Sequence, residues 1–331
     1  MKALFIGGTG LISQACTALA AERGVDLYLL NRGKRDVSLP ANITSIQADI
    51  RNPSQVKQAL GEHTFDVVAN FIAFNPTDIE TDLSLFTGRC GQYLFISSAS
   101  AYQRPVKNYW ITESTPLENP YWKYSRDKIA CEQRLMQAYR DDRFPVTIVR
   151  PSLTIGDGVL PHVLWYWSNP WTVAHRILQD KPLIVPGDGT SLWVITHNTD
   201  FAKGFVGLLG NASAIGEAFH ITSDEVTNWD QIYHTLADAL GKPAKLVHIA
   251  SDWLIRFDPA LEGSLLGDKS TSVAFDNSKI KSFVPDFRAT ISLRETAERC
   301  VKWFMLDPSR QKIDLVVDAK TDDAIMRYEG L

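Results

Sequence analysis

A glycine-rich turn near the N-terminus constrains the fold more than any other stretch. Residues 3–6 (Ala-Leu-Phe-Ile) form a short apolar run that ends at Gly7-Gly-Thr-Gly10. Such a run is too short for a helix and predicts a buried strand, and the apolar residues after residue 10 follow helical spacing. A strand, a glycine turn and a helix in this order can bind a pyrophosphate through backbone N–H groups. Glycine also serves purely steric needs in such turns, so the turn alone leaves both interpretations open.

The first 150 residues alternate between strand and helix signals. Nearly continuous apolar strands separated by helices are typical of a parallel sheet covered on both faces. We therefore expect a Rossmann-type, doubly wound α/β fold with its ligand at the carboxyl ends of the strands. The further strands are expected at 25–30, 43–47, 66–73, 92–97 and 146–149, and the helices at 53–60, 77–87 and 124–139.

The alternation of strand and helix signals becomes less regular after Arg150-Pro151, although helices are still indicated at 199–209, 228–240 and 293–303. We expect residues 1–150 to form the nucleotide-binding domain. Residues 151–331 are expected to form a smaller mixed α/β lobe that is interwoven with it and ends in a mixed, polar tail.

Composition excludes several function classes. The net charge is −4 and no lysine or arginine run occurs, so a nucleic-acid surface is not expected. Four scattered cysteines without metal-ligand spacing predict neither a metal site nor a disulfide framework. The N-terminal apolar run is too short for a signal peptide, and no run approaches the ~20 apolar residues of a membrane span. A cytoplasmic protein without membrane contact fits these observations.

Two groups of residues carry possible chemistry. Tyr124 and Lys128 lie four residues apart on an expected helix, so their side chains share one face. A nearby ammonium lowers the pKa of a phenol, which makes the pair a possible general acid/base. Ser98 and Ser100 follow the strand at 92–97, where a doubly wound fold places its site. Each group also has an ordinary structural explanation, as helix neighbours or as turn residues.

Taken together, these features resemble the extended short-chain dehydrogenases/reductases, the NAD(P)-dependent epimerase/dehydratase family. The resemblance runs from residue 2 to about 304, and no single motif carries it. The matching motifs are Gly7-Gly-Thr-Gly10, Asp49-Ile50, Phe71-Ile72-Ala73, Ser98, Tyr124-x-x-x-Lys128, Arg150-Pro151 through Gly156, Gly187-Asp-Gly189 with His197 and Asp200, Asp276-Asn-Ser-Lys279 and Trp303-Phe304.

The resemblance implies roles for these residues. Tyr124 would be the acid/base, Lys128 would lower its pKa and hold the ribose hydroxyls, and Ser98 would orient the substrate oxygen with Ser100 as a second donor. Hydride would pass between a substrate carbon and nicotinamide. The cofactor-binding residues that it implies are Gly7, Thr9, Gly10, Leu11, Ile12, Asn31, Arg32, Asp49, Ile50, Phe71, Ile72, Ala73, Tyr124, Lys128 and Pro151.

The chain departs from the family pattern at the cofactor end. Ser13 stands where a third glycine is usual, and no carboxylate ends the second strand. The local sequence Asn31-Arg32-Gly33-Lys34-Arg35 offers cations to a 2′-phosphate, which favours NADP while leaving NAD possible. The alternative is that Arg32 and Lys34 belong to a solvated loop. These features indicate an atypical branch, which includes reductase-like and chloroplast RNA-binding members.

The substrate lobe departs further. Leu153 and Trp193 occupy positions where nucleotide-sugar members carry an Asn and an Arg that grip the diphosphate. Trp165 and Trp193, with their neighbours Trp167 and Trp171, either line an apolar substrate pocket or pack in the core.

These observations lead to one principal hypothesis and one rival. The first is an NAD(P)-dependent oxidoreductase or epimerase/dehydratase that transfers hydride at a carbinol or carbonyl carbon of a small polar substrate, sugars included. The rival is a non-enzymatic NAD(P)-binding regulator or RNA-binding relative. The family resemblance also allows a homodimer through the helices at 77–87 and 124–139.

Overall fold

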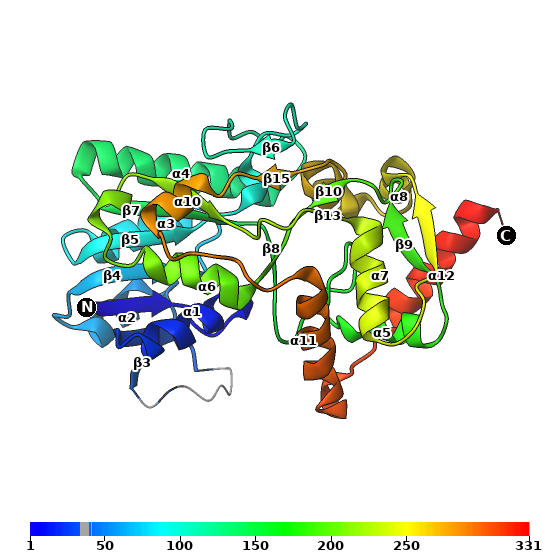
Figure 1. Ribbon diagram of the computed structural model, residues 1–331. Coiled ribbons are helices and arrows are strands. Elements are labelled where there is room, and N and C mark those ends of the chain that lie inside the picture. The colour runs from blue at the N-terminus through cyan, green and yellow to red at the C-terminus, as the bar shows by residue number, and fades with distance from the viewer. Residues whose placement is uncertain (34–39, 41, 331) are drawn as a thin grey trace.

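A seven-stranded parallel sheet forms one half of the computed structural model, which describes residues 1–33, 40 and 42–330 (Figure 1). The strand order β12-β7-β5-β4-β1-β2-β3, with every pair parallel, confirms the Rossmann-type fold. The strands are β1 (Lys2–Ile6), β2 (Asp26–Asn31), β3 (Ile43–Gln47), β4 (Phe65–Asn70), β5 (Cys90–Ile96), β7 (Val146–Pro151) and β12 (Ala218–Ile221).

Helices cover both faces of this sheet, which explains the continuous apolar strands. Successive side chains of a strand point to opposite faces. Ala3 and Phe5 therefore pack with one helical layer and Leu4 and Ile6 with the other, and all four are fully buried. The first layer contains α1 (Leu11–Glu22) and α6 (Asn198–Gly207), and the second contains α2 (Pro53–Leu60), α3 (Pro76–Phe86) and α4 (Lys123–Asp142).

The chain reverses direction across the sheet at β1. From β1 it runs outward through β2 and β3, and it then returns to β4 on the other side of β1. The connections that leave β1 and β4 therefore diverge, which opens a crevice at the carboxyl ends of these strands. The glycine turn after β1 lies at this crevice.

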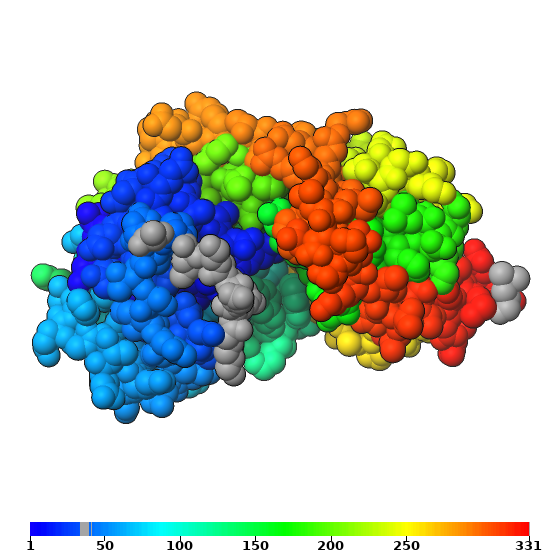
Figure 2. All heavy atoms as spheres, turned by 90° about the horizontal axis from the view of Figure 1, so that it is seen from below, coloured from blue at the N-terminus to red at the C-terminus, as the bar shows by residue number. Residues whose placement is uncertain are grey.

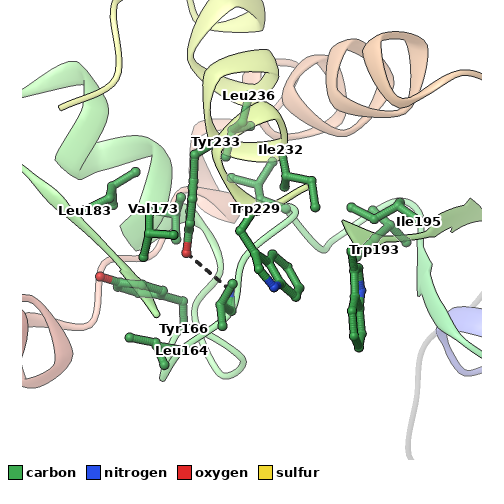
Figure 3. Packing of buried hydrophobic residues seen from close by; sticks show 14 of the residues in the cluster. Leu164, Tyr166, Val173, Leu183, Trp193, Ile195, Trp229, Ile232, Tyr233 and Leu236 are labelled. Carbon is green, nitrogen blue, oxygen red and sulfur yellow. Dashed lines mark hydrogen bonds between the residues drawn. The ribbon is translucent and has the colours of Figure 1, made fainter. Parts of the chain in front are cut away.

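The second half of the molecule has its own core, around α7 (Trp229–Ala239) and α11 (Leu293–Met305). The rings of Trp193 and Trp229 pack there with their centroids 5.0 Å apart and their planes tilted by 31°. Figure 3 shows both residues in this core. The remaining elements of this half are α5 (Trp171–Leu178), β9 (Leu183–Pro186) with β14 (Leu246–Ile249), β10 (Leu192–Trp193) with β13 (Thr227–Asn228), β8 (Leu153–Ile155) with β11 (Ile195–His197), β6 (Trp110–Ile111) with β15 (Ala274–Phe275), α8 (Ser251–Phe257), the π-helical turn η4 (Leu265–Lys269), α10 (Ser278–Phe283) and α12 (Leu315–Glu329).

The two halves exchange segments. Helix α6 packs on α1 and strand β12 completes the seven-stranded sheet, although both follow residue 151 in the sequence. In the view from below, α11 lies between the N-terminal residues and α12 (Figure 2). Among the helices of the described residues, none combines the length and apolar character that crossing a membrane requires.

One expectation from the sequence was wrong. The strand expected at 66–73 ends at Asn70, because the Asn70 side chain accepts a hydrogen bond from the Ile72 N–H (2.8 Å) and turns the backbone. The polar tail contains the helix α12, whose residues Thr321, Ala324 and Ile325 are buried against the second half.

Candidate active site

The turn after β1 requires glycine at its first position. Gly7 has a φ of +84°, which favours a residue without a side chain, and a Cβ atom there would lie 2.5 Å from Cγ2 of Ile72. The backbone of β1 therefore approaches the end of β4 closely, at the edge where the sheet reverses direction.

Ser13 fits the turn by cross-linking it. Its hydroxyl donates to the Gly7 carbonyl (2.7 Å) and accepts from the Gly10 N–H (2.8 Å), and the side chain is buried. A glycine at this position could make neither bond. The departure from the family pattern is thus compensated locally, because the hydroxyl satisfies two backbone groups of the turn.

A cavity of about 260 Å³ opens beside this turn. Arg32 and Arg51 contribute cations to its lining and Asp49 contributes a carboxylate. The structure brings together eight of the cofactor-binding residues expected from the sequence: Gly7, Thr9, Gly10, Asn31, Arg32, Asp49, Ile50 and Ile72. It adds Leu30, Gly33, Ala48, Arg51 and Phe74, which only their closeness to the expected residues could have indicated.

Other expected cofactor residues lie outside the lining of this cavity. Phe71 packs between the rings of Phe5 and Phe205, with centroids 5.5 and 5.2 Å away. The backbone carbonyl of Leu11 accepts from the Asn198 side chain (2.8 Å). Ile12, on the same helix, packs against the apolar core beneath the sheet. Lys34 and Arg35, which supported the expectation of NADP, lie outside the described residues.

Lys128 lies at the centre of the site, on α4. Its ammonium donates to the carbonyls of Ala73 and Ile96, both at 2.7 Å, and so links the ends of β4 and β5. Burial lowers the pKa of Lys128 to about 8. Ala73 therefore contributes to the site through its carbonyl, as a partner of the lysine.

Tyr124 lies one turn earlier on α4, and the Lys128 ammonium is 5.9 Å from the centre of its ring. The sequence led us to expect a pKa lowered by Lys128, whereas the net shift in the pKa of this phenol is upward. Burial raises the pKa of Tyr124, a hydrogen bond with Ser98 opposes the rise, and Asp268 adds to it. Because the ammonium is engaged by two carbonyls, burial dominates and the phenol keeps its proton.

Ser98 and Ser100 form a hydroxyl chain at the end of β5. Their Oγ atoms are 2.9 Å apart, and Ser125 on α4 donates to Ser100 Oγ at 2.7 Å. The chain ties the serine turn to the helix that carries Tyr124. A substrate oxygen near Tyr124 would therefore meet donors that already have fixed positions.

A buried ion pair holds α4 against the sheet. Arg150 at the end of β7 binds Glu132 through two hydrogen bonds of 2.9 and 2.6 Å, and Ser97 donates to the same carboxylate. Such two-pronged pairs fix orientation as well as distance. The pair thus sets the position of the Tyr124 and Lys128 side chains relative to the end of β5.

A second cavity, of about 230 Å³, has Tyr124 in its lining. The structure brings the expected residues Ser98, Ser100, Tyr124, Pro151 and Trp193 into its lining. Trp165 is not among them, since its indole donates to Asp258 (2.7 Å) and its ring packs on Phe257. The sequence did not indicate the other polar and aromatic lining residues, which are Arg104, Trp122, Ser152, Asp268 and Phe275.

The site suits a nicotinamide dinucleotide. The glycine turn and the N-terminus of α1 border the first cavity, and hydroxyl donors border the second. Lys128 binds the carbonyl of Ala73, whose neighbours Ile72 and Phe74 line the first cavity. In the described part of the chain, no cluster of three or more His, Cys, Asp or Glu residues could hold a metal ion.

The chain is similar in sequence to proteins named as a reductase and as a stem-loop binding protein, and in fold to an epimerase. It is 24% identical to the 2′-dehydrokanamycin reductase of Streptomyces kanamyceticus, over 76% of this chain and 70% of that protein. It is 25% identical to the chloroplast stem-loop binding protein of 41 kDa b of Arabidopsis thaliana, over 75% of this chain and 65% of that protein. The fold matches the UDP-glucose 4-epimerase of Bifidobacterium longum, solved with NAD⁺ and UDP, with a TM-score of 0.76, 18% identity and coverage of 94% and 100%.

The family model for NAD dependent epimerases/dehydratases matches residues 3–222, which is most of the chain. The match includes the turn after β1, the serines after β5 and the Tyr124–Lys128 pair. It confirms the resemblance on which the expectation of an NAD(P)-dependent enzyme of the oxidoreductase/epimerase class rested. The chain belongs to the NAD dependent epimerase/dehydratase family.

Proposed function

We propose that the protein is an NADP(H)-dependent reductase that transfers hydride to the carbonyl carbon of a compact polar substrate. The observation that carries this proposal is that Ser98 and Tyr124 line one cavity, while Lys128, 5.9 Å from the Tyr124 ring, binds the Ala73 carbonyl beside lining residues of the other. One cavity has the lining expected for a dinucleotide, and the other is bordered by hydroxyl and phenol groups.

The protonated phenol favours the reductive direction. When bound, the reduced nicotinamide supplies a hydride to the carbonyl carbon. Tyr124 gives its proton to the carbonyl oxygen, and Ser98 donates a hydrogen bond that polarises the same oxygen. Burial keeps the proton on Tyr124 before the reaction, since it raises the pKa of that phenol. The Lys128 ammonium, close to Tyr124 and the cofactor cavity, stabilises the phenolate that the reaction leaves.

The size and lining of the second cavity support a compact substrate. Its volume of about 230 Å³ is below the range of roughly 300–1,000 Å³ typical of ligand pockets. Leu153 and Trp193 line it at the positions where nucleotide-sugar members grip a diphosphate, and neither side chain can neutralise phosphate. A ring-bearing substrate of modest size agrees better with this lining than a nucleoside diphosphate sugar.

The reductase proposal is tested by following nicotinamide absorbance with a panel of aldehydes, ketones and keto acids. The wild type is expected to oxidise NADPH with at least one compound. Tyr124→Phe is expected to lose about 10²–10⁴-fold in kcat, the usual contribution of a general acid, while it still binds NADPH. Turnover by Tyr124→Phe at the wild-type rate would contradict the role of this phenol.

We propose NADP in preference to NAD because two cations line the adenosine end of the site. Arg32 and Arg51 border the same cavity, and a guanidinium can bind phosphate with two hydrogen bonds. The dissociation constants of NADPH and NADH test this. Arg32→Ala is expected to weaken NADPH binding by about 10- to 100-fold, the value of a charge-assisted hydrogen bond, and to leave NADH binding unchanged. Tighter binding of NADH by the wild type would overturn the preference.

A binding role without catalysis is the rival function, and the stem-loop binding relative motivates it. The Tyr124–Lys128 pair and the net charge of −4 favour the reductase. Titration with a labelled RNA stem-loop at physiological salt distinguishes the two. Tight binding of the stem-loop, together with no turnover across the carbonyl panel, would favour the rival.

We also propose a homodimer through α3 and α4, the pair that the family resemblance indicates. The two helices pack together and share an ion pair between Glu80 and Arg134 (2.5 Å) on their exposed side. Sedimentation of the wild type and of Arg134→Glu tests this. A wild type of monomeric mass would overturn it.

A further inference from the structure

Arg104 is a buried cation in the second cavity, and little of its hydrogen-bonding capacity is used. Its side chain is 2% exposed, and a guanidinium carries five N–H donors. Nη1 donates to the carbonyl of Gln103 at 3.2 Å, whereas Nη2 is 3.7 Å from Asp268, beyond hydrogen-bond distance. Nε has no partner among the described residues. A buried guanidinium with so few hydrogen bonds needs a further acceptor, which a ligand would provide.

The charges around Arg104 do not balance. Arg104 and Lys269 are positive, and Asp268 is the carboxylate between them, 3.0 Å from the Lys269 ammonium. Both cations are at most 5% exposed. The nearby His162 is neutral, since burial lowers its pKa to about 4, and Tyr124 keeps its proton. The cluster therefore has a net charge of +1, and an uncompensated buried charge is costly.

A second unpartnered donor lies in the same cavity. The indole N–H of Trp193 has no partner within the described part of the chain, and its side chain is 2% exposed. Trp193 borders the cavity together with Arg104, Asp268 and Tyr124. Buried indole N–H groups usually find an acceptor. Both unsatisfied donors thus belong to residues that line one cavity, next to a cluster with one excess positive charge.

We propose that the substrate carries a carboxylate that binds Arg104 and the indole N–H of Trp193, in the cavity where Tyr124 protonates its carbonyl oxygen. The inference rests on the proposed reductase function. A carboxylate has two oxygens in a plane, which match a guanidinium fork, and its single charge neutralises the cluster. A doubly charged phosphate would exceed the excess of +1 and would meet the Asp268 carboxylate. The substrate class is therefore a compact oxo acid.

The test compares the binding of benzoate with that of benzamide, which has nearly the same shape and no charge. Isothermal titration calorimetry on the full chain needs no turnover. The wild type is expected to bind benzoate about 10- to 100-fold more tightly than benzamide, and Arg104→Gln is expected to remove this preference while benzamide affinity stays within about twofold. The matched control is Arg294→Gln, an exposed arginine on α11, which should keep the wild-type preference.

If Arg104→Gln does not fold, a second variant that changes the charge of the cluster in the opposite direction provides the test. Asp268→Asn raises the net charge of the cluster to +2 and is expected to tighten benzoate binding several-fold without changing benzamide binding. Equal affinity of the wild type for the two compounds, no measurable benzoate binding, or weaker benzoate binding by Asp268→Asn would each overturn the proposal. A preference for benzoate without turnover of any oxo acid would leave this inference standing and count against the reductase. Equal turnover of an oxo acid and its methyl ester would support the reductase and count against the carboxylate site.

Discussion

Ser13 replaces the usual third glycine of the cofactor site, and its side chain links two backbone groups of the turn. In the usual fingerprint the third glycine allows close packing between helix and strand. Here a buried hydroxyl takes its place and bridges the Gly7 carbonyl and the Gly10 N–H, at 2.7 and 2.8 Å. The residue that departs from the pattern is therefore the one that holds the turn in shape. Its contribution can be measured, because alanine removes only the hydroxyl.

Ser13→Ala is expected to lower the free energy of unfolding by about 1–3 kcal/mol, the cost of leaving buried backbone groups unsatisfied. It should also weaken NADPH binding, since the turn borders the cofactor cavity. Urea unfolding and NADPH titration measure both effects. The control is Ser54→Ala, an exposed serine in the first turn of α2, for which a change within about 0.5 kcal/mol is expected. Equal effects of the two substitutions would contradict the role given to the Ser13 hydroxyl.

Lys128 makes cofactor binding depend on pH in an unusual range. Burial lowers its pKa to about 8, from the ordinary lysine value of 10.5. The charged form donates hydrogen bonds and attracts phosphate, so NADPH affinity is expected to fall as the pH rises through about 8. The folded state should instead gain stability from pH 8 towards 10.5, because the unfolded chain holds this proton more tightly.

Titration of NADPH between about pH 6.5 and 9.5 measures the dependence. Lys128→Met is expected to bind NADPH more weakly at neutral pH and to show no change through pH 8. Tyr124→Phe should keep the wild-type profile, since burial moves the pKa of Tyr124 upward, away from this range. A midpoint near that of ordinary lysine would contradict the effect of burial.

At the scale of elements, α4 carries the chemistry and one ion pair sets its position. Arg150 binds Glu132 with two hydrogen bonds, and both side chains are at most 6% exposed. Removal of one partner leaves the other as an unpaired buried charge. Glu132→Ala is therefore expected to cost about 3–5 kcal/mol of unfolding free energy, measured with urea.

The same helix provides a matched control. Lys123 and Asp127 form an ion pair of 2.5 Å on its exposed side, where solvent weakens the attraction. Lys123→Ala is expected to cost less than about 1 kcal/mol. A Glu132→Ala cost that small would show that the buried pair does not hold α4 to the sheet.

The elements also show where sequence analysis reaches its limit. The strand at 43–47 and the helix at 53–60 were predicted correctly, because local patterns determine them. The end of β4 was missed because the Asn70 side chain, which also donates to Asp82, turns the backbone. Arg104 and Asp268 were missed because they meet only through the fold, and neither belongs to a motif.

At the scale of the whole molecule, ion pairs with residues from distant parts of the sequence hold α12 against the second half. Arg176 on α5 is fully buried, and it binds Asp318 (2.6 Å) and Asp322 (2.7 Å) of α12. Lys181 joins the same two carboxylates at 2.6 and 2.8 Å. The helix has no clear apolar stripe, so its own sequence predicted a tail. Its position depends on partners more than 130 residues earlier in the chain.

Loss of these ion pairs is expected to destabilise the second half without changing cofactor binding. Asp318→Ala leaves the buried Arg176 with half of its ion pairs and is expected to cost about 3–5 kcal/mol of unfolding free energy. NADPH affinity should stay at the wild-type value, because the cofactor cavity is lined by the first half alone. The control is Asp323→Ala, whose partner Arg327 lies one turn further along the exposed side of α12, with an expected cost below about 1 kcal/mol. Loss of NADPH binding in folded Asp318→Ala would mean that α12 supports the whole molecule, and that the two halves do not differ in their dependence on it.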